Sequence, residues 1–377
     1  MYSAQIPPAD LSRVRYNAAA TMPTAIRDFA VFPVREPSGR EYVVVKVTAE
    51  DGVVGWGEAP AAGGAKAAAE RFSARREALL ELDPSAAEPF RRAVAALEPE
   101  LAGAADAAAL DILGKRSKAP AYEALAGRTR DKVRAIAVLS GPPERLAEQV
   151  RQASQAGFRA FAVPLPPPEG PTRGREFFVQ TRELLERLRE AGGGDDADFV
   201  LDCDSLLRVG EAAALAAVLE PFHLLWMDEP NIPLQDEAAR KISEESVTPV
   251  GRGRRSTAAQ FQDLLRMQIV DVLRPNVAAL GVRPARQAAA LAEAYYVAVS
   301  PYHRGGPVGL AAAIHTAAST PNSFSVDVPW GDEQDRAMRR ELAGVDFGAP
   351  EEGFLPLPTG PGLGVEIDEE ALRRYAA

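Results

Sequence analysis

Phe199-Val200-Leu201-Asp202 is the first of three short apolar runs that decide the fold, because each of them ends in an ionisable residue. The second run is Leu224–Asp228 and the third is Thr248–Arg254, and their last residues follow one another at intervals of 26. Apolar runs of this length that alternate with helix-length segments predict parallel strands joined by helices, a repeat that closes into a barrel. The charged residues that end the three runs are then expected at one mouth of the barrel.

Length and composition are those of a soluble globular protein. The 377 residues suffice for a barrel of about 250 residues and a second domain of about 100. The net charge of −10 argues against a nucleic-acid partner, because phosphate binding needs clustered, uncompensated Lys and Arg. No apolar run approaches the roughly 20 residues that span a bilayer, so we expect no membrane partner.

The chain contains a single cysteine, Cys203, which excludes an intrachain disulfide. The N-terminal residues include charges and prolines where a signal peptide would need an apolar core, so we expect a cytoplasmic protein. Because Cys203 alternates with Asp202 and Asp204, its thiol is expected to point out of the barrel into the helix layer and to be buried and inert.

The segments before the barrel predict a small α+β unit. Residues 25–34 and 42–48 alternate as two antiparallel strands, and residues 55–58 form a third strand after a turn at Asp51-Gly52. Alanine-rich segments within 65–97 and 102–117 have helical periodicity. Only a short connection separates the first two strands, which leaves the barrel mouth either open or covered by the N-terminal extension.

Eight barrel strands are expected in the remainder of the chain, separated by segments rich in Ala, Leu, Glu and Arg that suit the outer helices. The predicted strands are 135–139, 160–164, 199–204, 224–229, 249–254, 270–276, 297–303 and 324–328.

Three motifs carry a resemblance to a known family: Leu201–Asp204, Trp226–Pro230 and Ser300–Pro307. With the helical segment Ala108–Lys115, they resemble the enolase superfamily, in its mandelate racemase and muconate lactonizing enzyme-like group and the acid-sugar dehydratase branch. The resemblance covers residues 25–366 and implies an α/β fold, a (β/α)7β TIM-like barrel with an N-terminal α+β capping domain.

The domain boundaries follow from the element order and the resemblance. We expect an N-terminal extension over 1–22, the capping domain over 23–128, the modified TIM barrel over 129–340, and a C-terminal segment over 341–377 that returns to the capping domain.

The resemblance implies a Mg²⁺ ion held by carboxylates at the ends of the third, fourth and fifth barrel strands. Asp202 and Asp228 match two of these metal ligands, but the third position is Arg254, which cannot ligate a cation. Our hypothesis is that the Arg254 guanidinium takes the cation's place, keeps the net local charge the same and pairs with both carboxylates. No cofactor is then expected. The alternative is that Arg254 turns to solvent and an ion is held weakly by Asp202, Asp228 and Asp204.

The acid and base residues that the resemblance implies are replaced as well. The Lys-x-Lys pair of the second strand is represented by Ala162 and Pro164. The Asp that orients a catalytic His should follow Gln-Pro at the sixth strand, where this chain has Arg274-Pro275-Asn276; Pro301-Tyr302 stands at the position of the His. The usual means of moving a proton is therefore absent.

The polar residues that remain near the strand ends are the candidate site. For proton transfer these are Tyr302, His303 and Asp327, and for substrate binding Arg252, Arg254, Asp204, Glu229 and Asn276.

Several of these assignments have an alternative. His303 can be a structural loop histidine that faces away from the mouth, and either Asp327 or Val328 ends the eighth strand. Arg252, two residues before Arg254, is expected on the same inward face, where it either binds a substrate anion or satisfies a neighbouring carboxylate.

Three functional interpretations remain. The first is an isomerase or lyase of the enolase superfamily that acts, without Mg²⁺, on a small carboxylate or sugar-acid-type substrate. The second is a catalytically silent homologue that binds a small anion or has a regulatory role, and the third is a structural remnant. We expect a small anionic or polyhydroxylated ligand as partner, and a homo-oligomer. Function depends on the site and not on the fold alone.

Overall fold

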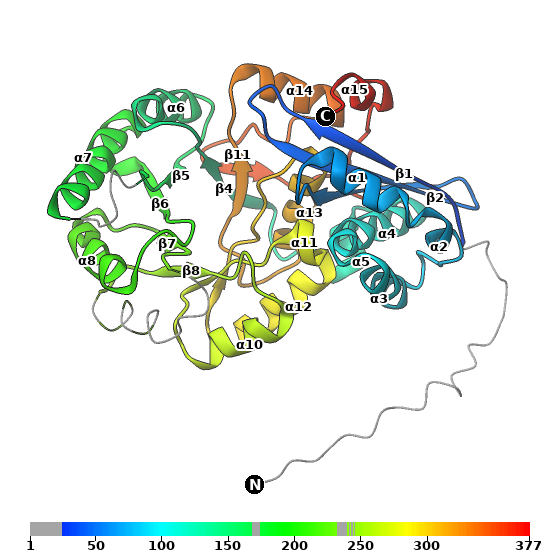
Figure 1. Ribbon diagram of the computed structural model, residues 1–377, viewed down its shortest axis with the longest axis horizontal. Coiled ribbons are helices and arrows are strands. Elements are labelled where there is room, and N and C mark those ends of the chain that lie inside the picture. The colour runs from blue at the N-terminus through cyan, green and yellow to red at the C-terminus, as the bar shows by residue number, and fades with distance from the viewer. Residues whose placement is uncertain (1–24, 168–173, 232–239, 241, 243, 245) are drawn as a thin grey trace, which may run out of the picture.

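The structure, a computed structural model, describes residues 25–167, 174–231 and 246–377, with 240, 242 and 244. The predicted N-terminal extension over 1–22 lies outside the described residues. Figure 1 shows two regions, a barrel wrapped by helices and a smaller unit containing β1, β2 and α1 to α5. The fold is the predicted one: an α/β barrel with an N-terminal α+β capping domain.

The capping domain is built on a three-stranded antiparallel sheet in the order β1-β2-β3. Its strands are β1 (Ile26–Arg35), β2 (Glu41–Ala49) and β3 (Val54–Pro60), close to the predicted segments. Gly55 and Gly57 in β3 let α4 (Ala102–Ser117) pack directly on the sheet, because a Cβ atom at these positions would lie 2.1 Å from the Ala108 carbonyl oxygen and 2.0 Å from that of Ala104. The close approach explains why glycine alternates in this strand.

The other helices of the capping domain are short. They are α1 (Ala65–Ser73), α2 (Arg76–Leu80), α3 (Ala87–Leu97) and α5 (Ala121–Leu125), with a 3₁₀ turn at Pro99–Leu101.

In the described residues, the barrel has eight parallel strands in chain order. They are β4 (Lys132–Val138), β5 (Ala160–Pro164), β6 (Asp198–Asp202), β7 (Trp226–Asp228), β8 (Val250–Arg252), β9 (Val272–Leu273), β10 (Ala298–Val299) and β11 (Val326–Pro329). β11 pairs with β4, and a bridge between Val299 and Ser323 brings β10 beside the segment that enters β11. The circle of strands is thereby closed.

Every predicted barrel strand is present, but two are much shorter than predicted. β9 and β10 have two residues each, whereas the predicted segments had seven. Pro275 and Pro301 lie in these segments and have no N–H for the ladder, so regular pairing stops before them. Both predicted segments nevertheless place side chains at the barrel mouth.

Helices surround the strands, as Figure 1 shows. They are α6 (Pro143–Gln155), α7 (Arg175–Gly192), α8 (Val209–Leu219), α10 (Ala258–Arg266), α11 (Val277–Leu280), α12 (Val282–Glu293), α13 (Pro307–Ala318) and α14 (Glu333–Ala343). Cys203 is buried in the apolar layer between the strands and these helices, as predicted. In the described parts of the chain, no helix combines the length and apolar character needed to cross a membrane.

The chain ends against the capping domain. β12 (Phe354–Pro356) first pairs antiparallel with β4 of the barrel, and α15 (Glu369–Arg374) then leads to a bridge between Ala376 and Val34 of β1. The last residues thus join the two regions.

Glu58 of β3 forms a second joint between the capping domain and the barrel. Its carboxylate accepts hydrogen bonds from the backbone N–H groups of Gly306, at 2.6 Å, and Gly309, at 3.0 Å, and so caps the start of α13. His303 lies 3.8 Å from the same carboxylate, but burial lowers the pKa of His303 to about 3. The imidazole is therefore neutral, and the contact is not an ion pair.

The Glu58 joint predicts a specific pH dependence. Burial raises the pKa of Glu58 from 4.5 to about 7, so its contribution to stability is full below pH 4.5 and is lost as the pH rises to 7. The free energy of unfolding of the wild type, minus that of Glu58→Gln, should therefore fall between pH 4.5 and 7 by at most about 1.4 kcal/mol per pH unit and then level off. Urea titrations at several pH values measure this difference, and a flat or rising difference would contradict the assignment.

Candidate functional site

Three aspartates meet where the barrel strands end at the mouth. Asp202 and Asp228 end β6 and β7 and are register partners, and both lie on the interior face. Asp327 of β11 is fully buried and also points into the barrel, while Val328 packs in the outer layer. The position that the sequence left open is thus held by Asp327.

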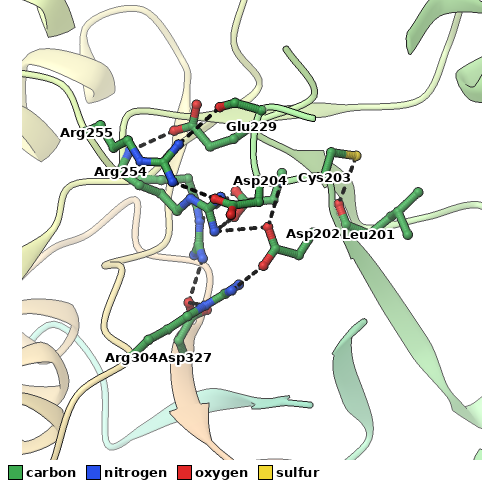
Figure 2. A network of polar contacts seen from close by, with 12 residues as sticks. Leu201, Asp202, Cys203, Asp204, Glu229, Arg254, Arg255, Arg304 and Asp327 are labelled. Carbon is green, nitrogen blue, oxygen red and sulfur yellow. Dashed lines mark hydrogen bonds and ion pairs between the residues drawn. The ribbon is translucent and has the colours of Figure 1, made fainter. Parts of the chain in front are cut away.

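The Arg254 guanidinium lies between the first two aspartates. Its Nη1 is 3.0 Å from Asp202 Oδ1 and 3.5 Å from Asp228 Oδ2, and its Nη2 donates to Asp204 Oδ1 at 2.9 Å. Only 4% of the side chain is exposed. Figure 2 shows Asp202 and Asp204 beside Arg254, with dashed lines for the contacts between the residues drawn. The guanidinium thus lies within 3.5 Å of both carboxylates.

Backbone geometry turns Arg254 inward. Gly253 has φ 121°, a conformation that L side chains rarely adopt, and it breaks the strand alternation just before Arg254. Glu229 fixes the turn, because its Oε1 accepts the N–H groups of Gly253 at 2.7 Å and Arg254 at 2.8 Å. Burial and then the Asp228 charge raise the pKa of Glu229. Glu229 therefore holds the backbone of Arg254; it was predicted to bind substrate.

Two further arginines, which the sequence analysis did not assign to the site, complete the network. Arg274 is fully buried and donates to Asp228 Oδ1 at 3.0 Å, Asp327 Oδ2 at 2.7 Å and Ser300 Oγ at 2.6 Å. Arg304 donates through Nη1 to Asp202 Oδ2. Three arginines therefore face three aspartates, and each of the aspartates has an arginine partner.

The charged groups of this network change one another's pKa values. Burial alone would raise the pKa of Asp202, but the Arg304 and Arg254 guanidinium groups outweigh burial and hold it below the ordinary value. Burial alone would lower the pKa of Arg254, but Asp228 and Asp202 raise it. Asp202 and Arg254 therefore stabilise each other's charged form.

Tyr302 lies among the three guanidinium groups. Its ring centroid is 5.2 Å from the guanidinium carbon of Arg254, 5.3 Å from that of Arg304 and 5.7 Å from that of Arg274. Cation–π contacts of this kind fix both the ring and the cations. Within the described residues the Tyr302 hydroxyl has no hydrogen-bond partner, so it is available to a ligand.

The residues at the mouth do not fit the Mg²⁺ ion that the family resemblance implies. Magnesium binds through oxygen ligands, and the position of the third carboxylate is held by a guanidinium that fills the gap between Asp202 and Asp228. In the described parts of the chain, no three His, Cys, Asp or Glu side chains are grouped to hold a metal ion.

The prediction that Arg252 shares the inward face of Arg254 is wrong. Gly251 is the register partner of Asp228 and Val272 and lies on the interior face, which leaves Arg252 on the opposite face with Leu273. There its Nη2 donates to the Asn231 carbonyl at 3.1 Å. The alternation fails between the two arginines because of the positive φ of Gly253.

Two other predicted site residues have structural roles. The His303 ring is buried, and its Nε2 donates to the Gly306 carbonyl at 2.8 Å beneath Glu58, in agreement with the structural alternative. The Asn276 side chain accepts the N–H of Ala279 at 3.2 Å and caps α11. Of the predicted residues, the structure therefore brings together Asp202, Asp204, Asp228, Glu229, Arg254, Tyr302 and Asp327.

A sequence signal existed for one of the two missed arginines, Arg274, but not for Arg304. Arg274 is two residues after Val272 in the predicted sixth strand, so the strand period of two places both on the interior face. Arg304 lies in the loop after β10, where no periodicity fixes the side-chain direction.

Comparison with known proteins assigns the chain to a family. Residues 145–371 match the family described as enolase C-terminal domain-like, and residues 24–126 match the mandelate racemase / muconate lactonizing enzyme N-terminal domain. The chain therefore belongs to the enolase superfamily, in its mandelate racemase and muconate lactonizing enzyme group.

Individual relatives resemble the chain over most of its length. The chain is 28% identical over 364 residues to D-xylonate dehydratase of Haloferax volcanii, a match that covers 89% of this chain and 85% of the relative. It superposes with TM-score 0.85 on a mandelate racemase/muconate lactonizing enzyme-like protein from Rubrobacter xylanophilus, at 24% identity and over 94% of this chain and 98% of the other. A mandelate racemase/muconate lactonizing enzyme from a Sulfitobacter species gives TM-score 0.83, 27% identity and coverage of 94% and 96%. The membership of the mandelate racemase and muconate lactonizing enzyme group agrees with the resemblance that the motifs carried.

The buried network predicts unequal effects for two adjacent arginines. Arg254→Ala leaves Asp202 and Asp228 short of a partner and should lower the free energy of unfolding by about 3 to 5 kcal/mol. Arg255→Ala is the matched control, because Arg255 is 56% exposed and pairs with Asp204 at the surface. It should cost about 0 to 1 kcal/mol. Chemical denaturation measures both variants, and equal costs would show that Arg254 does not hold the mouth together.

Proposed function

We propose that this chain binds a small sugar-acid-type carboxylate at the barrel mouth and acts on it as a lyase or isomerase without Mg²⁺. The observation that carries the proposal is the Arg254 guanidinium between Asp202 and Asp228, at 3.0 and 3.5 Å. The similarity to a protein named D-xylonate dehydratase supports the substrate class and favours dehydration over isomerisation.

The arginine network supplies positive charge where a bound acid would need it. Arg304 uses Nη1 for Asp202, while its Nε and Nη2 are buried without a hydrogen-bond partner. Buried N–H groups are nearly always hydrogen-bonded in folded proteins, so these donors call for an acceptor. A substrate carboxylate bound there would meet planar donors suited to bidentate binding.

Dehydration of a sugar acid needs charge stabilisation and proton transfer. The proton on the carbon next to the carboxylate is removed, the C–O bond at the neighbouring carbon breaks, and the departing hydroxide takes up a proton, which gives an enol and water. Fixed guanidinium groups stabilise the negative charge that develops on the carboxylate during the first step. Tyr302 is the residue we assign to proton transfer, because its ring is held among the guanidinium groups of Arg254 and Arg304 and its hydroxyl has no partner in the described chain.

A second candidate function is a silent homologue that binds a small anion without converting it. The observation in its favour is that Asp202, Asp228 and Asp327 are all engaged by arginine, which leaves none of them free to act as a base. The position of the family's lysine pair is also apolar, with Ala162 at the interior face of β5 and Pro164 at its end.

Hydrogen exchange separates the two candidates. The protein is incubated with D-xylonate and D-gluconate in D2O containing excess EDTA, and deuterium at the carbon next to the carboxylate and loss of the acid are followed by NMR. We expect incorporation or turnover in the wild type, a loss of at least 100-fold in Tyr302→Phe, and no change in Tyr296→Phe, whose side chain is 99% exposed.

Three other outcomes of this experiment would contradict the proposal or a part of it. Binding of the acid without exchange or turnover would support the silent homologue and overturn the enzyme proposal. Activity that disappears with EDTA and returns with Mg²⁺ would contradict the metal-independent part, and unchanged turnover in Tyr302→Phe would remove the assigned role of Tyr302.

A further inference from the structure

A cavity lies on the outer side of the barrel, between β11 and the helices α6, α13 and α14. It has a volume of about 400 Å³, within the range of roughly 300 to 1,000 Å³ for clefts that bind small molecules. Val328 of β11 lines the cavity and lies on the opposite face of the strand from Asp327 of the mouth. Among the described residues that line the cavity, none is a charged residue of the mouth network. The cavity is therefore separate from the proposed reaction site.

The position of α14 explains why this cavity exists. In a barrel of this class each strand is followed by a helix that covers the outside of the strands. α14 follows β11, the last barrel strand, but it packs on α13 and on α15 of the C-terminal segment. The space beside α6 is bordered instead by the loop over 345–349, which leaves a hollow against β11. The cavity is thus a product of the way the barrel ends.

One part of the lining is apolar. Leu310 of α13, Val328 of β11 and Trp330 are buried and line the cavity. Phe347 of the bordering loop is half-buried and lines it as well. The Trp330 ring is held by an edge contact with the ring of Phe158, with centroids 5.2 Å apart. Removing the apolar body of a ligand from water against these side chains would be favourable.

Three arginines of α14 line another part of the cavity, and they differ in how far they are engaged. Each of the three guanidinium nitrogens of Arg336 and of Arg339 donates a hydrogen bond within the protein. Arg340 donates through Nη2 to Glu333 Oε1 at 2.6 Å, and its Nη1 lies 3.7 Å from Asp346 Oδ2. In the described part of the chain, Nη1 of Arg340 makes no hydrogen bond. Arg340 is therefore the arginine with a donor left for a ligand.

A second donor without a partner belongs to the same lining. The indole Nε1 of Trp330 is buried and has no hydrogen-bond partner among the described residues. A buried indole N–H usually has an acceptor, and an acceptor on a ligand would satisfy it. The guanidinium carbon of Arg336 lies 4.2 Å from the centroid of the Trp330 ring. The three arginines outnumber the two acids of the lining, Glu333 and Asp346, by one charge, which suits a monoanion.

We propose that this cavity binds a small aromatic carboxylic acid as a ligand. The carboxylate pairs with Arg340 at the rim, and the ring system packs on the apolar lining formed by Leu310, Val328 and Phe347. The inference goes beyond the proposed function, because the site lies outside the barrel and its ligand is not the sugar acid bound at the mouth.

A pair of compounds with the same ring system tests the inference. 2-Naphthoate carries an apolar body and one negative charge, and 2-naphthamide has the same body without the charge. Isothermal titration of the full-length protein should show 2-naphthoate binding at one site per chain, with a Kd at least fivefold below that of 2-naphthamide. Excess gluconate should leave the Kd of 2-naphthoate unchanged, because the proposed site for gluconate is the mouth.

Two variants locate the ligand. Arg340→Gln should raise the Kd of 2-naphthoate at least fivefold and leave that of 2-naphthamide unchanged. Ala349→Trp adds an indole at an exposed position of the lining and should abolish the binding of both compounds. The matched controls are Arg373→Gln, at an arginine of α15 that is 65% exposed, and Ala74→Trp, at an exposed alanine after α1. Both controls lie outside the lining and should leave the Kd values unchanged.

The inference is overturned if 2-naphthoate shows no saturable binding, binds no tighter than 2-naphthamide, or keeps its Kd in either Arg340→Gln or Ala349→Trp. Displacement of 2-naphthoate by gluconate would also overturn it, since the ligand would then lie at the mouth. None of these results bears on the proposed function, which the exchange experiment with D-xylonate and D-gluconate tests separately.

Discussion

The contact on which the rest of the mouth depends is the ion pair of Arg254 with Asp202 and Asp228. Two carboxylates at neighbouring strand ends repel each other in a buried site unless a positive charge lies between them. Here a guanidinium supplies that charge at 3.0 and 3.5 Å. Everything nearby supports this placement, from the positive φ of Gly253 to the Glu229 carboxylate that holds the Arg254 backbone.

The consequence for chemistry is that the guanidinium supplies positive charge without the Lewis acidity of a metal ion. A guanidinium stabilises an anion through hydrogen bonds and charge, and it does not exchange ligands or polarise a bound oxygen as a cation does. Arg274 pairs in the same way with Asp228 and Asp327, and Arg304 pairs with Asp202. Three arginines therefore neutralise three aspartates at the mouth. Within this network the Nε and Nη2 atoms of Arg304 are buried without a hydrogen-bond partner, and Nε lies 3.7 Å from Asp327 Oδ2.

Much of this arrangement could be predicted from the sequence, because strand alternation and run length are local properties. β5 was predicted to the residue, and the equal spacing of Asp202, Asp228 and Arg254 placed them at one mouth. The predictions that failed depended on residues outside the strand in question. The inward prediction for Arg252 assumed unbroken alternation, which Gly253 interrupts, and the partner of Arg304 lies about a hundred residues away in sequence. The role of His303 depends on Glu58 of another domain.

The most direct test of the account is a calorimetric titration of Mg²⁺ into the wild-type protein, with Arg254→Glu titrated alongside. If the guanidinium holds the cation's place, the wild type shows no saturable heat at millimolar Mg²⁺, and the variant with three carboxylates at the mouth gains a binding isotherm. Tight binding of one Mg²⁺ per chain by the wild type would contradict the account.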